Sequence, residues 1–494
     1  MVCYFYLILL LAKTDFLNVK IYYKTAIDRR KEWGMKRILI HGGLVVTGDH
    51  AGRYDVAVAG ERIQSLGSTG AFSPDDFDDT IDAQGLIVMP GLVEPHVHFD
   101  APFMGGTTDH DMLTGTKACA YGGITSVISF SNQPKGASLV QNVRDWDENN
   151  RGRAYVDWSM HGLVYDASEQ TLRDIPELVK LGVPTYKCFT TYRHSGRLMD
   201  DDSMLLVLHA TAESGGMLMV HCEHDATCEY LTRKAITEGR TDWIYHAKTR
   251  PAMAEDMAIQ RVADLLQTVP APVYIVHAST ADSVRIVAQA QAKGLPIRAE
   301  TCTHYLILTE EQLKGEDGYL YICSPPLRTE RDIERLWNAV HSGPIEVVSS
   351  DDAGLPSEMR KRLAEGRFDK VPSGMPGVEP RLTLLYSEGV RKNRFDLPKL
   401  VELTSANPGR LFGLNNKGSL EPGSDADIVL FDPTVEWIMS ASTLHMNTDF
   451  CPFEGRRVMG KSKTLLCRGE FVLRDFELTG SPSHGRRVFR KLEG

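Results

Sequence analysis

Eight short apolar runs alternate with amphipathic stretches along the middle of this 494-residue chain, and this alternation limits the folds that it can adopt. Helix-like stretches at residues 204–214, 253–267, 281–293 and 331–341 lie between the later runs. Short buried strands that alternate with helices over about 260 residues are typical of a parallel (β/α)8 barrel. We therefore expect an α/β fold whose eight strands are residues 92–99, 124–130, 158–164, 184–189, 217–221, 273–277, 297–305 and 345–351.

Several of these runs carry side chains that can bind a metal ion. His96 and His98 flank one residue near the end of the first run, and alternate side chains of a strand point to the same face. Two neutral imidazoles at a strand end are a common beginning of a transition-metal site. Because the carboxyl ends of all eight strands surround one mouth, we expect ligand candidates of later strands to converge there. These candidates are Lys187, His221, His277 and Asp351.

Each candidate also has a purely structural explanation. A lone His-x-His pair is most often incidental, Lys187 can extend to solvent, and His277 can be a hydrogen-bonded core histidine. Five independent coincidences at one barrel mouth are hard to accept, so we interpret the set as a site. Cys222 follows His221 directly, and strand alternation turns it to the opposite face, which argues against a thiolate ligand.

With these residues in place, the chain resembles the cyclic amidohydrolases of the dihydropyrimidinase and hydantoinase type, a branch of the amidohydrolase superfamily. The resemblance extends from about Met35 to the C-terminal region, and the order and spacing of the ligand candidates match it. Its motifs include Pro-Gly-Leu-Val-Glu-Pro-His-Val-His, Tyr-Lys-Cys-Phe and Cys-Ser-Pro-Pro-Leu-Arg. Together they occupy residues 90–98, 115–125, 186–189, 300–306, 323–328 and 467–472.

The resemblance implies a hydrolase that opens a cyclic amide or ureide at a pair of divalent metal ions. One ion would be held by His96, His98 and Asp351, and the other by His221 and His277. Nitrogen and oxygen ligands without thiolate suit zinc, and manganese or cobalt also fits. Two such ions about 3.5–4 Å apart supply a nucleophilic hydroxide and polarise the carbonyl oxygen of the substrate.

Four histidines and one aspartate are too few to satisfy two ions and also hold them together, so a bridging anion is needed. The family obtains it by carbamylating a lysine with CO2, and the resemblance therefore implies that Lys187 is an N6-carboxylysine. Asp351 would act as general base and then as general acid. Tyr192, five residues after Lys187, matches the phenol that donates a hydrogen bond to the tetrahedral oxyanion.

The resemblance also indicates substrate contacts. Ser324 matches a residue whose backbone binds the substrate ring, and Ser373 stands where an asparagine with a backbone contact is expected. Phe103 and Phe189 fall where apolar side chains shape the pocket for the exocyclic substituent. Phe189 fits core packing equally well.

Two residues near the site depart from the family pattern. Glu94 stands where aspartate is frequent, and Asp352 follows Asp351 where hydantoinases typically have histidine. Only spacing selects Asp351 rather than Asp352 as the ligand. The preferred ring is therefore left open.

Three other functions were weighed against this one. A dihydroorotase is set aside because Phe-Asp at residues 99–100 replaces the arginine that usually follows His-x-His. An allantoinase-type hydrolase is the first alternative, since residues 300–305 and 377–382 are similar to allantoinase motifs. A metal-free scaffold or binding protein of the same fold is the alternative from a different class, and the complete ligand set argues against it.

The chain divides into a barrel and flanking segments. We expect residues 89–409 to form the metal-hydrolase barrel, and residues 35–88 and 410–494 to form one small β-sandwich with a C-terminal tail. Residues 1–34 are expected to be a start-site artefact or a disordered extension. Their apolar run at residues 4–12 is too short for a membrane span and lacks the features of a signal peptide.

Charge and cysteine content narrow the partners and the compartment. A net charge of −10 argues against nonspecific nucleic-acid binding, and we expect no membrane association. Nine cysteines without framework spacing indicate a reduced, cytoplasmic setting. The expected partner is a small-molecule cyclic amide, and the resemblance implies a homo-oligomer, either a tetramer or a dimer.

Overall fold

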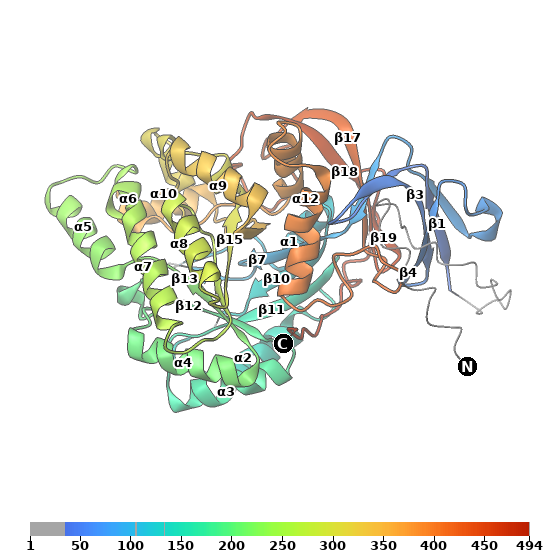
Figure 1. The fold of residues 1–494 in the computed structure, drawn as a ribbon. Helices are drawn as coiled ribbons and strands as arrows, with labels where there is room; N and C mark the ends of the chain where they lie inside the picture. Colours follow the sequence, from blue (N-terminus) through green and yellow to red (C-terminus); the bar gives the residue numbers. More distant parts are fainter. Residues whose placement is uncertain (1–34, 104–105, 133, 494) are drawn as a thin grey trace, which may run out of the picture. The chain divides into compact units, whose positions relative to one another are not determined.

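The computed structural model describes residues 35–103, 106–132 and 134–493 (Figure 1). The extension expected over residues 1–34 lies outside the described residues. None of the helices in the described part of the chain has the length and hydropathy that a membrane span requires.

Eight parallel strands form the barrel, and they follow one another around the sheet in sequence order. Every residue of the second to fifth strands is buried, because helices cover the outside and side chains fill the inside. This confirms the (β/α)8 fold that the apolar runs predicted. The strands are β7 (Leu92–Val97), β10 (Ile124–Phe130), β11 (Asp157–Leu163), β12 (Thr185–Phe189), β13 (Met217–His221), β14 (Val273–Ile275), β15 (Ile297–Cys302) and β16 (Ile345–Ser349).

Helices connect these strands, and several begin at residues that the sequence marks as caps. The side chains of Ser138, Ser168 and Asp200 each accept a hydrogen bond from the third residue of the following helix, which satisfies an otherwise unpaired amide. The helices are α1 (Met112–Tyr121), α2 (Leu139–Asn150), α3 (Glu169–Lys180), α4 (Asp201–Ser214), α5 (Asp225–Thr237), α6 (Tyr245–Thr249), α7 (Ala252–Leu265), α8 (Ala281–Ala292), α9 (Glu330–Ser342), α10 (Ser357–Ala364), α11 (Arg381–Leu384), α12 (Leu397–Val401) and α13 (Asn407–Leu411).

A second, curled sheet of ten strands combines the two ends of the described chain. Its N- and C-terminal parts meet where β6 pairs antiparallel with β17, with Val88 opposite Leu430. The sheet encloses a core of its own, in which Val58, Val88 and Ile428 are completely buried. Its strands are β1 (Arg37–His41), β2 (Leu44–Val46), β3 (Ala51–Ala59), β4 (Arg62–Ser68), β5 (Asp79–Asp82), β6 (Ile87–Pro90), β17 (Ile428–Ile438), β18 (Arg457–Cys467), β19 (Glu470–Arg474) and β20 (Glu477–Leu478).

Gly91 alone separates the last N-terminal strand of the curled sheet, β6, from the first barrel strand, β7. A Cβ atom at this position would lie 2.3 Å from the side chain of Thr125, so the close approach of β7 to β10 requires glycine. The sandwich and barrel limits at residues 88 and 409 stay a prediction. A further short hairpin, β8 (Pro102–Phe103) and β9 (Gly106–Thr107), follows β7.

Alternate residues of the barrel strands fill the barrel interior. One core cluster contains Phe130, Met219, Tyr274 and Val347, contributed by four different strands. Lys187 lies opposite Met219 in the register of β12 and β13, so the lysine side chain faces the same interior.

Candidate active site

The residues expected to bind metal lie at the carboxyl ends of their strands. His96 and Lys187 lie within β7 and β12, and His221 is the last residue of β13. His277 and Asp351 lie two residues beyond the ends of β14 and β16, so the expectation that both strands continue to these residues is wrong.

The physical reason is a left-handed backbone at the ligand positions. His277 has φ of 44°, Asp351 has φ of 48°, and Tyr192 has φ of 69°. Such a conformation ends the strand ladder and costs about 1–3 kcal/mol at a residue other than glycine. Residues held in this way cluster at functional sites, where the surrounding structure fixes their side chains.

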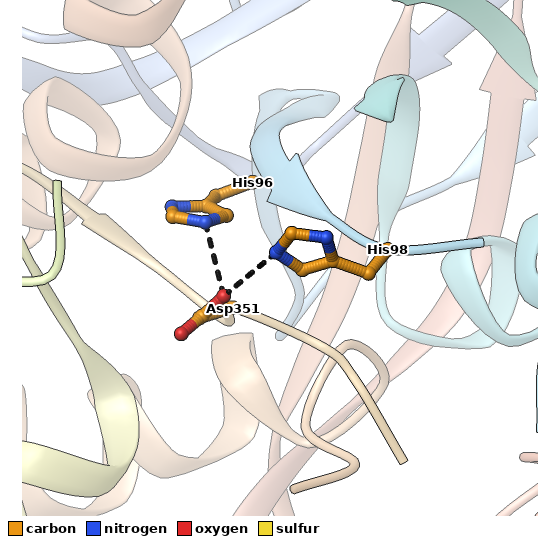
Figure 2. Close-up of side chains that lie close together, drawn as sticks. All are labelled: His96, His98 and Asp351. Atoms are coloured by element: carbon orange, nitrogen blue, oxygen red, sulfur yellow. Dashed lines mark ion pairs between the residues drawn. The ribbon is translucent and has the colours of Figure 1, made fainter. Parts of the chain in front are cut away.

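Asp351 contacts both His96, in β7, and His98, one residue beyond the end of that strand (Figure 2). Its Oδ1 atom lies 3.0 Å from His96 Nε2 and 3.3 Å from His98 Nε2. Single ligand atoms of the three side chains lie within 4.8 Å of one another, a spacing that can surround one metal ion. His96 is completely buried, and the nearby histidines hold the pKa of Asp351 well below its usual range despite burial.

The adjacent Asp352 has a different environment. Its Oδ2 atom accepts hydrogen bonds from the backbone amides of Gly377 at 2.7 Å and Val378 at 3.0 Å. Asp352 therefore fixes the loop that follows β16, whereas Asp351 contacts the histidines. The contacts thus identify Asp351 as the ligand candidate, a choice that sequence spacing alone supports only weakly.

Lys187 reaches the same centre from β12. Its Nζ atom lies 3.0 Å from His96 Nε2 and 4.5 Å from the centre of the Phe130 ring. Burial is the main cause that lowers the pKa of Lys187 to about 8, although Asp351 and Glu300 act in the opposite direction. A lysine with a lowered pKa is neutral, and hence nucleophilic, in a larger fraction of molecules near neutral pH.

His221 and His277 form the other side of the centre. Their ring centres lie 4.6 Å apart, and the His277 ring centre lies 5.6 Å from that of His96. Both side chains are almost completely buried, and burial lowers the pKa of each, which favours the neutral imidazole that binds metal. Among the described residues, the buried Nδ1 atom of His277 has no hydrogen-bond partner.

His221 is oriented by a charged pair that the sequence analysis missed. His221 Nε2 lies 2.8 Å from Glu223 Oε2, and Arg250 Nη1 donates to the same oxygen at 2.6 Å. The guanidinium carbon of Arg250 also lies 5.3 Å above the ring of Tyr192. The arginine thus connects the orientation of a metal-site histidine with the position of the tyrosine.

Tyr192 and the two serines come together at this side. The ring centre of Tyr192 lies 5.1 Å from that of His221, and burial raises the pKa of Tyr192 to about 12. The phenol is therefore a hydrogen-bond donor at neutral pH. Ser324 is close enough to Tyr192 to oppose the rise of its pKa, and Ser324 Oγ lies 3.2 Å from Ser373 Oγ.

Of the two phenylalanines expected at the substrate pocket, Phe189 lies beside the site. Phe189 is buried, and its ring centre lies 5.6 Å from that of His221 and 5.9 Å from that of Tyr192. It borders the site and belongs to the barrel core at the same time. Phe103 lies in β8, and its side chain is outside the part of the chain that the structure describes.

Glu300 is a second functional candidate that the sequence analysis quoted only as part of a motif. Its completely buried carboxylate contacts His96 Nδ1, accepts a hydrogen bond from the Tyr274 hydroxyl at 3.1 Å, and accepts one from the His277 amide at 3.3 Å. Such a partner fixes the ring orientation of a metal-binding histidine. The available signal was a glutamate inside the apolar run of the seventh strand.

The donor set fits a pair of divalent ions. It offers four imidazoles, one carboxylate and a lysine nitrogen. Cys222, which follows His221 in the sequence, directs its thiol to the Val220 carbonyl oxygen instead. Nitrogen and oxygen donors of this kind suit zinc, manganese or cobalt. His96, His98 and Asp351 could hold one ion, and His221 and His277 a second.

The chain matches known proteins over most of its length. Residues 87–472 match the model of the amidohydrolase family. The D-hydantoinase of Geobacillus stearothermophilus is 38% identical over 464 residues, which cover 92% of this chain and 97% of that protein. The D-phenylhydantoinase of Escherichia coli O1:K1 / APEC is 37% identical over 458 residues, which cover 92% and 98%. The crystal structure of the dihydropyrimidinase from Brevibacillus agri NCHU1002 has a TM-score of 0.90 and 39% identity, and covers 93% of this chain and 99% of that chain.

Proposed function

Since this chain belongs to the amidohydrolase family, together with relatives named hydantoinase and dihydropyrimidinase, we propose that it opens the ring of a hydantoin or a dihydropyrimidine to an N-carbamoyl amino acid. The observation that carries the proposal is the convergence of six side chains from five strands of one barrel. They are His96, His98, Lys187, His221, His277 and Asp351.

His96, His98 and Asp351 would hold one divalent ion, and His221 and His277 would hold the other. Zinc is the proposed metal, and manganese or cobalt also satisfies these donors. When bound, such a pair polarises a carbonyl oxygen and lowers the pKa of water so that it attacks at neutral pH.

Lys187 would bridge the two ions as a carbamate. In that modification the lysine ammonium first loses one proton, and the neutral amine then forms a bond to the carbon of CO2 and releases a second proton, which leaves a carboxylate-like anion. The lowered pKa of Lys187, about 8, increases the fraction of neutral amine that can react. The resulting negative charge would offset the charge of two divalent ions inside a buried site.

Asp351 and Tyr192 would carry the proton and charge movements of the reaction. Asp351 would accept a proton from the attacking water and deliver it to the leaving ring nitrogen, acting first as general base and then as general acid. The Tyr192 phenol, protonated at neutral pH, would donate a hydrogen bond to the oxyanion that develops on the attacked carbonyl.

Ser324 and Ser373 would bind the substrate ring, and Phe103 and Phe189 would border its exocyclic substituent. Support comes from the pairing of the two serine hydroxyl groups beside Tyr192 and from the position of Phe189 against His221. The assignment of Phe103 rests on the family resemblance alone.

We further propose a cytoplasmic homo-oligomer, a tetramer or a dimer. The eight described cysteines are all buried and free, which supports a reducing compartment. The oligomeric state rests on the resemblance, and sedimentation velocity of the purified protein measures it.

A side-by-side assay tests the proposed reaction. Protein reconstituted with zinc is incubated with a 5-substituted hydantoin, dihydrouracil, allantoin and dihydroorotate, and ring-opened products are quantified by chromatography. The highest kcat/KM is expected for the hydantoin or dihydrouracil. A preference for allantoin would favour the allantoinase alternative, and absence of both turnover and bound metal would favour a scaffold.

A further inference from the structure

The barrel has a seam between its first and last strands. The ladder of paired strands runs from β7 through β10 to β16. Within the described residues β16 and β7 share no ladder, and their backbones meet at an isolated bridge just beyond β16, between Val97 and Asp352, where the His98 amide donates to the Asp352 carbonyl oxygen at 2.8 Å. These two strands deliver His96, His98 and Asp351, the residues proposed above to hold the first ion. The separation of these ligands therefore depends on the contacts that connect β7 with β16.

Arg381 occupies this seam. Its side chain is completely buried, and it donates from Nη1 to the Val348 carbonyl oxygen of β16 at 3.0 Å and from Nη2 to the Val93 carbonyl oxygen of β7 at 3.0 Å. Val93 lies three residues before His96, and Val348 lies three residues before Asp351. At a rise of about 3.3 Å per residue, the guanidinium spans the seam about 10 Å below both ligands and fixes their relative register.

Glu94 continues the same connection toward the ligands. Its Oε2 atom lies 3.2 Å from Arg381 Nε, and both side chains are completely buried. Its Oε1 atom accepts hydrogen bonds from the His96 amide at 2.9 Å and from the Ser350 amide at 3.3 Å. One carboxylate oxygen thus joins the main chain of one ligand to the residue that precedes the other.

From these contacts we infer that Glu94 and Arg381 are positioning residues that set the distance between the His96–His98 pair and Asp351. The inference builds on the proposed metal site. It assigns to this pair the connection between β7 and β16 before the Val97–Asp352 bridge, where a backbone ladder joins neighbouring strands elsewhere in the barrel. It also gives a structural meaning to glutamate at position 94, because its carboxylate must reach the seam amides and the guanidinium together.

Metal binding by variants tests the inference. Arg381→Met and Glu94→Gln each remove one half of the connection, and zinc affinity is measured by competition with a chromophoric chelator. Each variant is expected to lose about 10- to 100-fold in affinity at one of two zinc equivalents, the usual effect of disturbing residues that orient ligands, while the other equivalent is unchanged. The double variant is expected to lose no more zinc affinity than the more strongly affected single variant, because the two residues act as one unit.

A matched control separates positioning from general destabilisation. Arg468→Met breaks another buried arginine–carboxylate pair, with Asp157 at the amino end of β11, far from the ligand ends of the strands. It is expected to lower the free energy of unfolding in urea while leaving both zinc affinities intact. The inference is overturned if Arg381→Met and Glu94→Gln behave like this control.

A replacement variant and the behaviour of the wild-type protein provide two further tests. If Arg381→Met does not fold, Arg381→Lys replaces it, because lysine keeps the charge but lacks the planar guanidinium fork that reaches both carbonyl oxygens. Wild-type zinc affinity in both Arg381→Lys and Glu94→Gln would overturn the inference. A wild-type protein that binds no zinc and opens no cyclic ureide would instead refute the proposed function, which is a distinguishable outcome.

Discussion

Lys187 Nζ lies 3.0 Å from His96 Nε2 inside the barrel, although the two residues are 91 positions apart in the sequence. Lys187 comes from β12 and His96 from β7, and both side chains are buried. Burial disfavours the ammonium form of Lys187, whereas the nearby carboxylates of Asp351 and Glu300 favour it, and the pKa is lowered to about 8. This position of Lys187 supports the proposal that the lysine is modified and shared between two cations.

Lys187→Ala tests this explanation. The variant is expected to lose bound metal and turnover together, because the bridging anion is removed. Short carboxylic acids such as acetate or propionate should partly restore both, since they supply a carboxylate in the space that the side chain leaves. Metal content and hydantoin hydrolysis are measured with and without the added acid. Wild-type activity without any acid would exclude the bridging role.

Tyr192→Phe tests the phenol as an oxyanion donor. Removing one preorganised donor typically lowers kcat by about 10²- to 10³-fold. Because the ring is retained against His221 and below Arg250, metal content is expected to stay at the wild-type value. Steady-state kinetics and metal analysis provide the two measurements. A variant with unchanged kcat would assign Tyr192 to packing.

The neighbouring carboxylates Asp351 and Asp352 should give opposite phenotypes. Asp351→Asn is expected to abolish turnover and reduce metal content, because its carboxylate contacts both His96 and His98. Asp352→Ala leaves the amides of Gly377 and Val378 without their acceptor and should cost about 1–3 kcal/mol of unfolding free energy while metal content is retained. Urea unfolding and metal analysis distinguish the two, and a reversal of the phenotypes would contradict the assignment.

His246 makes the stability of the metal-free protein depend on pH. Burial lowers the pKa of His246 to about 3 in the folded state, where its Nε2 atom lies 2.7 Å from the Cys323 carbonyl oxygen. The ordinary value is about 6.5, so between these values the unfolded chain binds a proton that the folded chain does not. Stability is therefore full above pH 6.5 and falls as the pH decreases toward 3.

The matched variant is His246→Gln. Between pH 7.5 and pH 5 this histidine becomes protonated in the unfolded wild-type chain. The unfolding free energy of the wild type should therefore decrease by about 2 kcal/mol more than that of His246→Gln over this range. Urea titrations at the two pH values measure the difference. Identical pH dependence in the two proteins would show that His246 is not the titrating group.

The barrel itself could be predicted from the sequence because its strands are buried on both sides and therefore appear as continuous apolar runs. His96, Lys187 and His221 could be placed at the mouth for the same reason, since each interrupts or ends such a run. The ends of β14 and β16 were placed two residues too late, at His277 and Asp351. A left-handed backbone at a histidine or an aspartate leaves no local sequence signal.

The residues that orient the ligands could not be predicted from the sequence, for a different reason. Arg381 bonds to Val93 across 288 positions, and Arg250 meets Glu223 across a connecting segment rather than along a helix or a strand. No periodicity links such pairs. Arg381 meets Val93 only when the barrel closes, and Arg250 meets Glu223 only when the connection between β13 and β14 folds back on itself. Glu300 is the exception, since a buried glutamate within an apolar strand is itself a sign of a charged partner in the interior.

Removal and return of metal test the central claim most directly. The wild-type protein is treated with a chelator at a pH where it stays folded, assayed with a 5-substituted hydantoin, and then titrated with zinc while activity and bound metal are followed together. We expect activity to disappear with the metal and to return in full at two equivalents per chain. Hydrolysis that continues at the wild-type rate in protein free of metal would contradict the account.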